Sequence, residues 1–546
     1  MEGLYKDLER RIESSPPGLC PVDMARAFLE LCHAQTCGKC VPCRIGLGQL
    51  NNFIREVLDG KATMKTLDIM EQTALSIMES ADCAIGYEAA NMVYKGLIGY
   101  RDDYIEHIQN GRCTCTYNQP VPCVSLCPAH VDIPGYIALV GEGRYADAIR
   151  LLRKDNPFPT TCGFICEHPC EARCRRNMVD DSINIRGLKR VAADFAGEVD
   201  PPQCAPSTGK KIAILGGGPG GLSAAYYLQL MGHQTTVYEM LPELGGMLRY
   251  GIPNYRLPKE RLDDDIRAIL KTGVQVKNGL KIGQDITIQE LRQQYDVVLI
   301  TIGASTDKKL GLENEDADGI ISAVQFLRNV GKNQIIDLTG KEVVVIGGGN
   351  VSMDAVRTAK RLGAKKVSIV YRRRVADMTA LPGEIEGAVA EGIELQTLKA
   401  PASIDVDENH HVKGIYVTPQ MVSSIRDGRA SIKPTGEEDI YIPCDVLIVA
   451  IGQNIETHHF EQAGIPVERG KIITKSTGAF ENLPGVFAGG DCASGPASVI
   501  KAIAAAKVVA ANIDEYLGYH HEISCDVEIP EAHLDDRTPC GRVNLT

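Results

Sequence analysis

The sequence predicts two Rossmann-type α/β domains, each of the dinucleotide-binding kind, preceded by two mainly α-helical, cysteine-rich domains. Three observations lead to this prediction. Fourteen of the 19 cysteines lie within the first 174 of 546 residues. Two segments, starting at Lys211 and Lys341, each read as an apolar strand, a glycine turn, a helix and a second strand. Between these two parts of the chain lies EVDPPQCAPSTGK, rich in proline and small polar residues, which is typical of a linker.

Composition excludes several classes of protein. With 58 basic and 70 acidic residues the net charge is -12, which argues against a general nucleic-acid-binding surface. No uncharged apolar run reaches the length of about 18 residues that a membrane span needs. The first residues, MEGLYKDLERRIESS, lack the apolar core of a signal peptide. We therefore expect a soluble, cytoplasmic chain, whose dense cysteines indicate metal or cluster ligation and not disulfides.

The domain boundaries follow from changes in pattern along the chain. Stretches such as MARAFLELCHA and YADAIRLLRK repeat apolar residues at helical spacing before the linker. The polar, proline-containing end of the chain reads as a tail. The expected parts are a helical cluster domain at 1–108, a helical two-cluster domain at 109–205, a first dinucleotide-binding domain in two pieces at 206–340 and 451–516, a second dinucleotide-binding domain at 341–450, and a tail at 517–546; the motifs below predict FAD for the first and NADP(H) for the second.

The first glycine motif places Gly216, Gly218 and Gly221 at the three positions of G-x-G-x-x-G. The first glycine permits a tight turn, the second lets the backbone approach a pyrophosphate, and the third lets helix and strand pack closely. The following helix, opening at Pro219, points its amide end at the phosphates. Glu239 ends the next strand, where a carboxylate can accept both ribose hydroxyls.

The second glycine motif differs from the first in two ways. Gly347 and Gly349 are present, but Ser352 takes the third position, where a small residue still permits close packing. At the end of the next strand, where an acid would select NAD, stand Arg372 and Arg373. Guanidinium groups bind a 2′-phosphate through charge-assisted hydrogen bonds, so this site should prefer NADP(H). The alternative is a solvated basic run on a surface loop.

A third signal lies near the C-terminus, where NLPGVFAGGD reads as a strand that runs into a Gly490-Asp491 turn and then a helix. In flavoproteins with two dinucleotide domains, a segment of this kind returns to the FAD domain, and its Asp binds the ribityl–pyrophosphate region. The stretch Ala450-Ile451-Gly452 would be the crossover between the two domains.

The first cysteine motif is C-x2-C-x2-C at Cys37, Cys40 and Cys43, with Cys83 following 40 residues later. Three thiolates on a tight loop and a distant fourth are typical of a 4Fe–4S cluster, with zinc as the main alternative. CGKCVPCR and DCAIG resemble the cluster-bearing segment of the NADH-oxidising, FMN-containing subunit of respiratory complex I. Only 36 residues precede Cys37, so we expect the cluster segment without the flavin domain that normally precedes it.

A second run of eight cysteines suffices for two further clusters, and it includes the C-x3-C-P ending of bacterial ferredoxins. Its members are Cys113, Cys115, Cys123, Cys127, Cys162, Cys166, Cys170 and Cys174. Cysteines outside these two groups carry no motif and read as free thiols.

Over residues 109–517 the chain resembles the small subunit of NADPH-dependent glutamate synthase. It is also similar to the matching parts of dihydropyrimidine dehydrogenase and NADPH–ferredoxin transhydrogenase. The motifs that carry the resemblance include TTCGFICEHPCEARCRR, GGMLRYGIPNYRLP, GGGNVSMDA and VFAGGD. It implies that FAD contacts also come from Gly246, Arg249 and Ile252, and that NADP(H) contacts also come from Asn350, Val351 and Gly452.

The same resemblance implies two ligand sets. One cluster would take Cys115 or Cys113 with Cys123 and Cys174, and the other would take Cys127, Cys166 and Cys170. Two positions depart from the family. The first pair is C-x-C instead of C-x2-C, and Lys189 stands where some members use a glutamine ligand. Either Cys162 is a substitute ligand or one cluster is altered or missing, so we expect two or three clusters in total.

Hydride transfer between a nicotinamide and FAD needs two stacked rings and no compulsory acid–base residue, so none is assigned. The prediction is an NADP(H)-dependent FAD/iron–sulfur subunit of a ferredoxin-linked transhydrogenase or hydrogenase, with electron bifurcation as one option. Expected partners are an FMN-containing NADH-oxidising subunit, small iron–sulfur subunits and ferredoxin. The alternatives are a glutamate synthase small-subunit homologue that feeds an amidotransferase, and a non-catalytic cluster scaffold.

Overall fold

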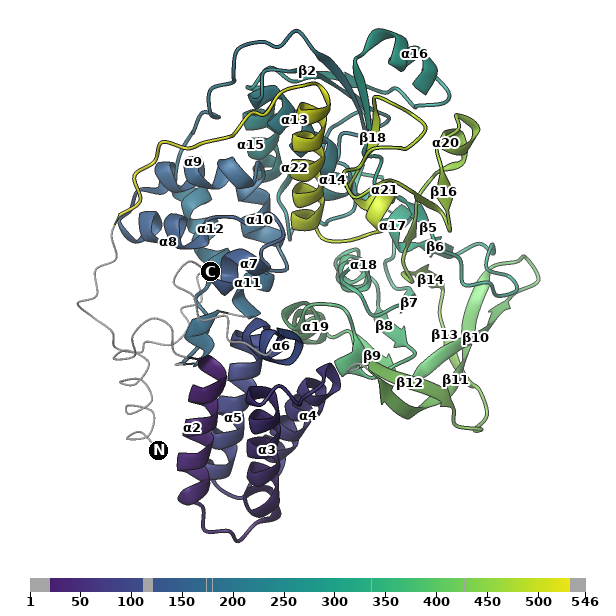
Figure 1. Cartoon of the computed structure of the whole chain (residues 1–546). Coiled ribbons are helices and arrows are strands. Elements are labelled where there is room, and N and C mark those ends of the chain that lie inside the picture. Colours follow the sequence, from purple (N-terminus) through teal and green to yellow (C-terminus); the bar gives the residue numbers. More distant parts are fainter. Residues whose placement is uncertain are drawn as a thin grey trace. The chain divides into compact units, whose positions relative to one another are not determined.

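The computed structural model describes residues 20–110, 121–172, 174–178, 180–334, 336–426 and 429–530 (Figure 1). These residues form two compact units. Unit one holds the described residues up to Glu142, His168–Val191 and those from Ile529 onward, and unit two holds Gly143–Glu167 and Ala192–Glu528. No helix in the described ranges is long and apolar enough to cross a membrane.

Unit one begins with a helical bundle. Its elements are α2 (Pro21–Ala34), the π-helical turn η1 (Pro42–Gly46), α3 (Leu47–Leu58), α4 (Met64–Ser80), α5 (Ala84–Gly99) and α6 (Arg101–Asn110). The pattern of α3 shows why the bundle forms, because Leu47, Leu50, Ile54 and Val57 recur on one face and are all fully buried. Thr63 and Thr66 cap α4 reciprocally at its N-terminus.

The rest of unit one consists of short elements. They are α7 (Pro122–Leu126), α8 (Ile133–Gly141), α11 (Pro169–Ala172), the 3-10 turn η2 (Arg175–Met178) and the start of α12 (Ile185–Phe195). The helices α7 and α11 pack together, and η2 packs on α5. The Tyr136 hydroxyl donates to the Ile185 carbonyl at 2.8 Å, and the Arg175 guanidinium lies 5.3 Å from the centre of the Tyr100 ring.

Unit two contains a first parallel sheet in the order β18-β4-β1-β2-β3. Its strands are β1 (Lys211–Leu215), β2 (Gln234–Glu239), β3 (Gln275–Asn278), β4 (Val297–Ile300) and β18 (Val486–Ala488). The apolar runs of β1 and β4 are buried, as expected for a sheet covered on both faces. Helices α13 (Pro219–Leu230) and α22 (Val499–Tyr516) pack side by side against it, with α15 (Lys259–Leu270) and α16 (Ile288–Gln294) nearby (Figure 1).

The second parallel sheet has the order β6-β14-β7-β8-β9. Its strands are β6 (Ile320–Ser322), β7 (Glu342–Ile346), β8 (Lys366–Tyr371), β9 (Glu394–Thr397) and β14 (Val446–Val449), with helices α17 (Ala323–Gly331), α18 (Asn350–Arg361) and α19 (Pro382–Ala390). Strand β6 lies within the range expected for the FAD domain, yet it pairs with β14 of this sheet.

An antiparallel sheet extends from the second Rossmann-type domain. It comprises β10 (Lys399–Val406), β11 (Val412–Arg426), β12 (Arg429–Pro434) and β13 (Ile440–Pro443). The remaining helices of unit two are α9 (Tyr145–Asp155), α10 (Pro159–Ile165), α14 (Met247–Tyr250), α20 (His458–Gln462) and α21 (Asp491–Ser494). The short strand pairs are β5 (Thr306–Asp307) with β15 (Gln453–Asn454) and β16 (Val467–Glu468) with β17 (Lys471–Ile472). Helices α9 and α10 come from the cysteine-rich stretch of sequence but belong to unit two.

Candidate cofactor sites

The first glycine turn connects β1 to α13, and two of its three motif glycines, Gly216 and Gly221, leave no room for a side chain. Gly216 has a φ of +113°, and a Cβ there would lie 2.5 Å from the Thr301 carbonyl oxygen. A Cβ on Gly221 would lie 1.9 Å from the Gly216 carbonyl oxygen, and one on Gly246 would lie 2.8 Å from the Gly218 Cα. Helix α13 starts at Pro219, so its free amides face the turn. This is the backbone cradle that a pyrophosphate requires.

Glu239 stands at the end of β2 beside this turn. Its carboxylate is buried and accepts hydrogen bonds from the Gly217 and Leu241 backbone amides at 2.7 and 2.8 Å. Burial raises the pKa of Glu239, and the two amide bonds oppose that shift. A cavity at the carboxylate is lined by Met240 and Ile282 among others. The carboxylate is therefore held where it could accept the hydroxyls of a ribose.

The Gly490-Asp491 turn reaches the same edge of the sheet. Strand β18 pairs in parallel with β4, and the Gly489 amide donates to the Ile300 carbonyl at 3.0 Å. Gly490 has a φ of +73° and leads into α21, which starts at Asp491. Burial raises the pKa of Asp491. Because β1, β4 and β18 are parallel, their carboxyl ends bring Asp491 to the edge that carries Gly216.

Two other residues expected to contact FAD, Arg249 and Ile252, form hydrogen bonds or ion pairs with other residues of the chain. The Arg249 guanidinium donates to the Leu244 carbonyl at 2.6 Å and forms ion pairs with Glu243 and Asp263. The Ile252 carbonyl accepts a hydrogen bond from the Lys259 ammonium at 2.6 Å. Burial lowers the pKa of Lys259 to about 8. These contacts shape the loop between α14 and α15.

The second glycine turn opens onto a cavity of about 1130 Å³. Every residue predicted for NADP(H) lines it, namely Gly347, Gly349, Asn350, Val351, Arg372, Arg373 and Gly452. Gly347 has a φ of +148°, and a Cβ there would lie 2.3 Å from the Ala450 carbonyl oxygen and 2.5 Å from the Ser352 Oγ. The turn and the start of α18 fit a dinucleotide pyrophosphate as the first turn does.

The basic run at the end of β8 divides into different roles. Arg374 pairs with Asp377 at 2.8 Å and holds the pKa of that carboxyl at about 2. The Nε of Arg373 donates to the Ala430 carbonyl at 3.0 Å, while Arg372 is exposed at the cavity. Arg372 and the outer nitrogens of Arg373 are therefore placed to meet a phosphate.

Sequence reasoning missed several residues at this cavity. Lys308, Lys501 and Glu167 also line it. A Cβ on Gly452 would lie 3.3 Å from the Lys308 Cδ, and the Asn350 amide donates to the Glu167 Oε1 at 3.1 Å. None of these three belongs to a recognisable glycine or strand-end pattern, so only the fold reveals them.

A buried ion pair joins the loop before α15 to α18. The Arg256 Nη1 lies 2.9 and 2.8 Å from the two carboxylate oxygens of Asp354, and its Nε lies 3.1 Å from Glu384. The Tyr255 ring lies under two guanidinium groups of α18, those of Arg357 and Arg361, at 5.0 and 3.8 Å. We call these six side chains the clasp. It connects the loop next to the first glycine turn with the helix that opens at the second.

In unit one the structure brings Cys37, Cys40, Cys43 and Cys83 together. Burial and the neighbouring Cys40, Cys83 and Cys37 thiols raise the pKa of Cys43 to about 12. The pKa of Cys40 is lowered by hydrogen bonds from the backbone at Cys43 and Asp82. A Cβ on Gly86 would lie 2.6 Å from the Cys43 sulfur, so glycine makes the space for it. Four converging thiols and backbone amides suit a 4Fe–4S cluster.

The second cysteine group is only partly within the described residues. Cys113 and Cys115 lie outside them. Burial and the Cys174 thiol raise the pKa of Cys123, so these two sulfurs lie near each other in unit one. Unit one also contains Cys127 and Cys170, both buried, whereas Cys162 and Cys166 lie in unit two at α10.

Two features bear on the expected departures in this group. The Lys189 ammonium lies 5.8 Å from the centre of the Tyr136 ring in unit one. The sulfur of Cys162, which is fully buried, lies 3.9 Å from the Asn156 Oδ1.

Two dinucleotide sites and the grouped cysteines define an NADP(H)-dependent flavoprotein oxidoreductase with iron–sulfur clusters. The family model of pyridine nucleotide-disulphide oxidoreductases matches residues 210–506, which is more than half of the chain, and the protein belongs to that family. Residues 23–107 match the iron–sulfur binding region of the NADH-ubiquinone oxidoreductase F subunit. Residues 99–200 match domain II of dihydropyrimidine dehydrogenase, a 4Fe–4S domain. The cofactors are FAD, NADP(H) and 4Fe–4S clusters, as predicted.

Relatives along nearly the whole chain are subunits of complexes. The beta subunit of an NADP(+)-dependent formate dehydrogenase from Moorella thermoacetica is 32% identical, covering 90% of this chain and 79% of its own length. The beta subunit of an NADPH-Fe(3+) oxidoreductase from Geobacter sulfurreducens is 34% identical, covering 92% and 79%. The small chain of glutamate synthase from Escherichia coli is 34% identical, covering 72% and 88%. The chain is thus an NADP-dependent FAD/iron–sulfur oxidoreductase, as predicted.

Among solved structures, FprA from Mycobacterium tuberculosis is similar in fold. It superimposes with a TM-score of 0.50 at 21% identity, covering 57% of this chain and 85% of FprA. The likeness concerns the Rossmann-type architecture alone.

Proposed function

We propose that this subunit moves hydride between NADP(H) and FAD and passes single electrons through its clusters to a partner subunit. In this proposal FAD lies on the Gly216 turn with Glu239 and Asp491, and NADP(H) lies on the Gly347 turn with its 2′-phosphate at Arg372. When bound, the flavin supplies the exchange between two-electron and one-electron chemistry. The protein supplies the two cradles and their relative placement.

One observation carries the proposal most directly. The cavity at the Gly347 turn is also lined by Pro496, Ala497, Ser498 and Lys501, which follow the Gly490-Asp491 turn of the FAD domain. A single cavity therefore extends from the arginines at the end of β8 to the segment proposed to hold the flavin. That continuity supports direct hydride transfer, because the reaction needs the two rings in contact away from water.

The surface at the first cluster site supports transfer to a partner. Cys37 and Cys83 are exposed, and the neighbouring Val41 and Ile45 are 55% and 50% exposed. Exposed apolar side chains beside metal-ligand positions favour a protein interface. We propose that this surface docks a subunit with its own redox cofactor, namely a homologue of the FMN-containing NADH-oxidising subunit. Small iron–sulfur subunits and ferredoxin are the further partners.

The type of complex remains a prediction from the sequence. The names of the relatives point to formate dehydrogenase and Fe(3+) reductase, and neither a hydrogenase nor electron bifurcation is indicated by them. The glutamate synthase alternative is less favoured, because that match covers 72% of this chain against 90% and 92% for the two beta subunits.

The test is anaerobic mixing of the purified chain with NADPH while flavin absorbance is followed, together with identification of subunits and flavins in the native complex. NADPH should bleach the flavin, and a second flavoprotein subunit should co-purify. A flavin that NADPH cannot reduce in a correctly loaded chain would contradict the proposal and favour a scaffold role.

A further inference from the structure

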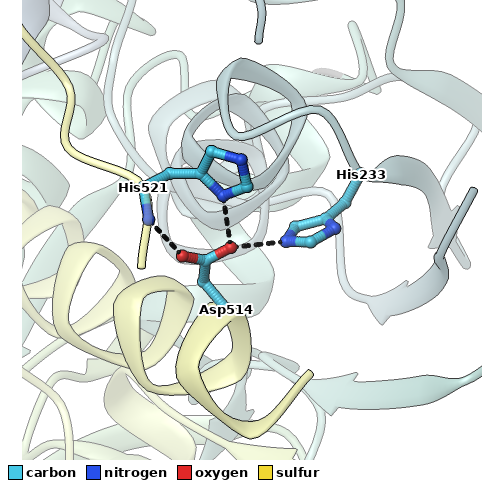
Figure 2. A group of neighbouring side chains, drawn as sticks. All are labelled: His233, Asp514 and His521. Carbon is cyan, nitrogen blue, oxygen red and sulfur yellow. Dashed lines mark hydrogen bonds and ion pairs between the residues drawn. The ribbon is translucent and has the colours of Figure 1, made fainter. Parts of the chain in front are cut away.

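Three side chains that the cofactor sites do not use meet at the start of the C-terminal tail (Figure 2). His233 lies between α13 and β2, Asp514 lies near the end of α22, and His521 lies beyond that helix. The His233 Nε2 and the His521 Nδ1 are each 2.8 Å from the same Asp514 oxygen, Oδ1. One ligand atom from each residue lies within 4.8 Å of the other two. Two distant parts of the sequence, the turn before β2 and the end of α22 with the residues after it, thus present two imidazole nitrogens and a carboxylate to one point.

The cluster is buried and its carboxylate lacks a permanent counter-charge. His233 is fully buried and Asp514 is 2% exposed. Within the described ranges no lysine or arginine forms an ion pair with Asp514, whose partners are the two imidazoles and the His521 backbone amide. Buried carboxylates are normally paired with a cation or coordinate a metal ion.

The far side of the His233 ring is oriented as metal-bound histidines usually are. The His233 Nδ1 lies 2.7 Å from the Thr208 Oγ1, and that hydroxyl lies 3.2 Å from the Gly232 carbonyl oxygen. In the tautomer that donates from Nδ1 to Thr208, which in turn donates to Gly232, the Nε2 lone pair faces the Asp514 carboxylate, and a cation between the two would take the place of the Nε2 proton that otherwise makes the 2.8 Å hydrogen bond. Such an outer hydrogen bond fixes both the tautomer and the ring plane of a ligand histidine.

We infer that His233, Asp514 and His521 form a binding site for one divalent metal ion of the zinc type. Two imidazoles and one carboxylate are a ligand set that zinc accepts, and a fourth position can be taken by water. The His521 side chain is 26% exposed, so solvent reaches that side of the site. The ion would tie the tail to α22 and to the turn before β2. The Tyr519 ring is stacked on the His521 ring, with a centroid distance of 5.4 Å.

The test measures zinc in the cluster-loaded full chain, purified anaerobically and dialysed against a weak chelator. We expect one equivalent of zinc in addition to the iron. X-ray absorption at the zinc edge should show only nitrogen and oxygen neighbours, at about 2.0–2.1 Å. Sulfur neighbours at about 2.3 Å would mean that zinc occupies cysteine sites, and would overturn the inference.

Matched variants identify the residues. His521→Ala and Asp514→Asn should each lower zinc affinity at least tenfold, while His520→Ala, which changes the adjacent exposed histidine, should keep it. Added zinc should raise the melting temperature of the wild type and of His520→Ala but not of His521→Ala, since a ligand stabilises only the state that binds it. Equal zinc content in His521→Ala and His520→Ala, or a wild type without zinc, would show a purely hydrogen-bonded cluster and refute the metal site.

Discussion

Arg372 lies just beyond the last residue of β8, at the strand end where an acidic side chain would select NAD. Its neighbours show how one basic run serves two purposes, since Arg374 is committed to Asp377 while Arg372 reaches the large cavity. The sequence alone could not separate these roles because all three residues share one charge and one side-chain type.

Replacing Arg372 by glutamine should weaken NADPH and spare NADH. One charge-assisted contact is worth about 1.5–3 kcal/mol, so the Kd for NADPH should rise by roughly 10- to 150-fold. NADH lacks the 2′-phosphate and should change less than twofold. Titration of flavin reduction with both nucleotides checks this, and equal losses for the two would show that Arg372 supports the structure and does not select the coenzyme.

Asp265 on α15 offers a pH test in unit two. It is fully buried, it accepts the Thr160 and Thr161 amides at the start of α10, and burial raises its pKa to about 6. A carboxyl whose pKa is higher in the folded state stabilises the fold at low pH, and this contribution is lost as pH rises through about 6. Between pH 5 and pH 7 the free energy of unfolding should therefore fall by about 1.4 kcal/mol more in the wild type than in Asp265→Asn.

Denaturant titrations followed by flavin fluorescence measure that difference. The Asp265→Asn protein has its own overall stability, so only the change with pH is compared. Parallel pH dependences of the two proteins would mean that Asp265 stays ionised over this pH range, stabilised by the charge of Arg153, and would refute the prediction.

At the scale of elements, the most telling one is α18. Its first residues line the cavity at the Gly347 turn, and its middle holds Asp354 and Arg357 of the clasp. Arg256→Ala should leave Asp354 buried without its partner, which costs about 3–5 kcal/mol. We expect hydride transfer from NADPH to slow at least tenfold with a smaller change in NADPH affinity. Stopped-flow reduction separates the two, with Arg261→Ala, which removes ion pairs of α15 with Asp194 and Asp264 away from the clasp, as the control.

The surface around η1 gives a second element-scale prediction. Val41→Asp combined with Ile45→Asp should reduce co-purification of the partner subunit at least tenfold, because charge would have to be buried at the interface. NADPH-driven dye reduction by the chain itself should stay unchanged. Val508→Asp, a change at a 53% exposed valine on α22, is the matched control. Assembly that survives the double variant would move the docking surface elsewhere.

How far the sequence predicts these elements depends on how local the determinant is. The Gly216 and Gly347 turns were predictable because close backbone contact demands glycine at fixed spacing. Arg256 and Asp354 are 98 residues apart, and nothing in either segment announces the other. The same holds for His233 and Asp514, and for β6, whose short apolar run fits either sheet. Pairings of this kind are decided by tertiary packing and become visible only in the folded chain.

At the scale of the whole molecule, the prediction concerns the order of the cofactors. Cys40→Ser should remove one cluster signal from the electron paramagnetic resonance spectrum and about four iron atoms from a total of about 12 or about 8, for three or two clusters. NADPH should still reduce the flavin at the wild-type rate, while turnover with the partner complex is lost. Cys204→Ser, at an exposed cysteine without a motif, is the control. Loss of flavin reduction in a folded Cys40→Ser protein would reverse the proposed order.

The clasp also determines which segments must be exchanged together when chimeric reductases are built from this family. Exchanging residues 341–450 for those of an NADH-using relative would import a new α18 but leave Tyr255 and Arg256 behind on the recipient. If the donor helix lacked an acidic residue at the position of Asp354, Arg256 of the recipient would be buried without its ion-pair partner. The segment to exchange in such chimeras is therefore residues 341–450 together with the Gly251–Leu257 loop, although that loop lies some ninety residues earlier in the sequence.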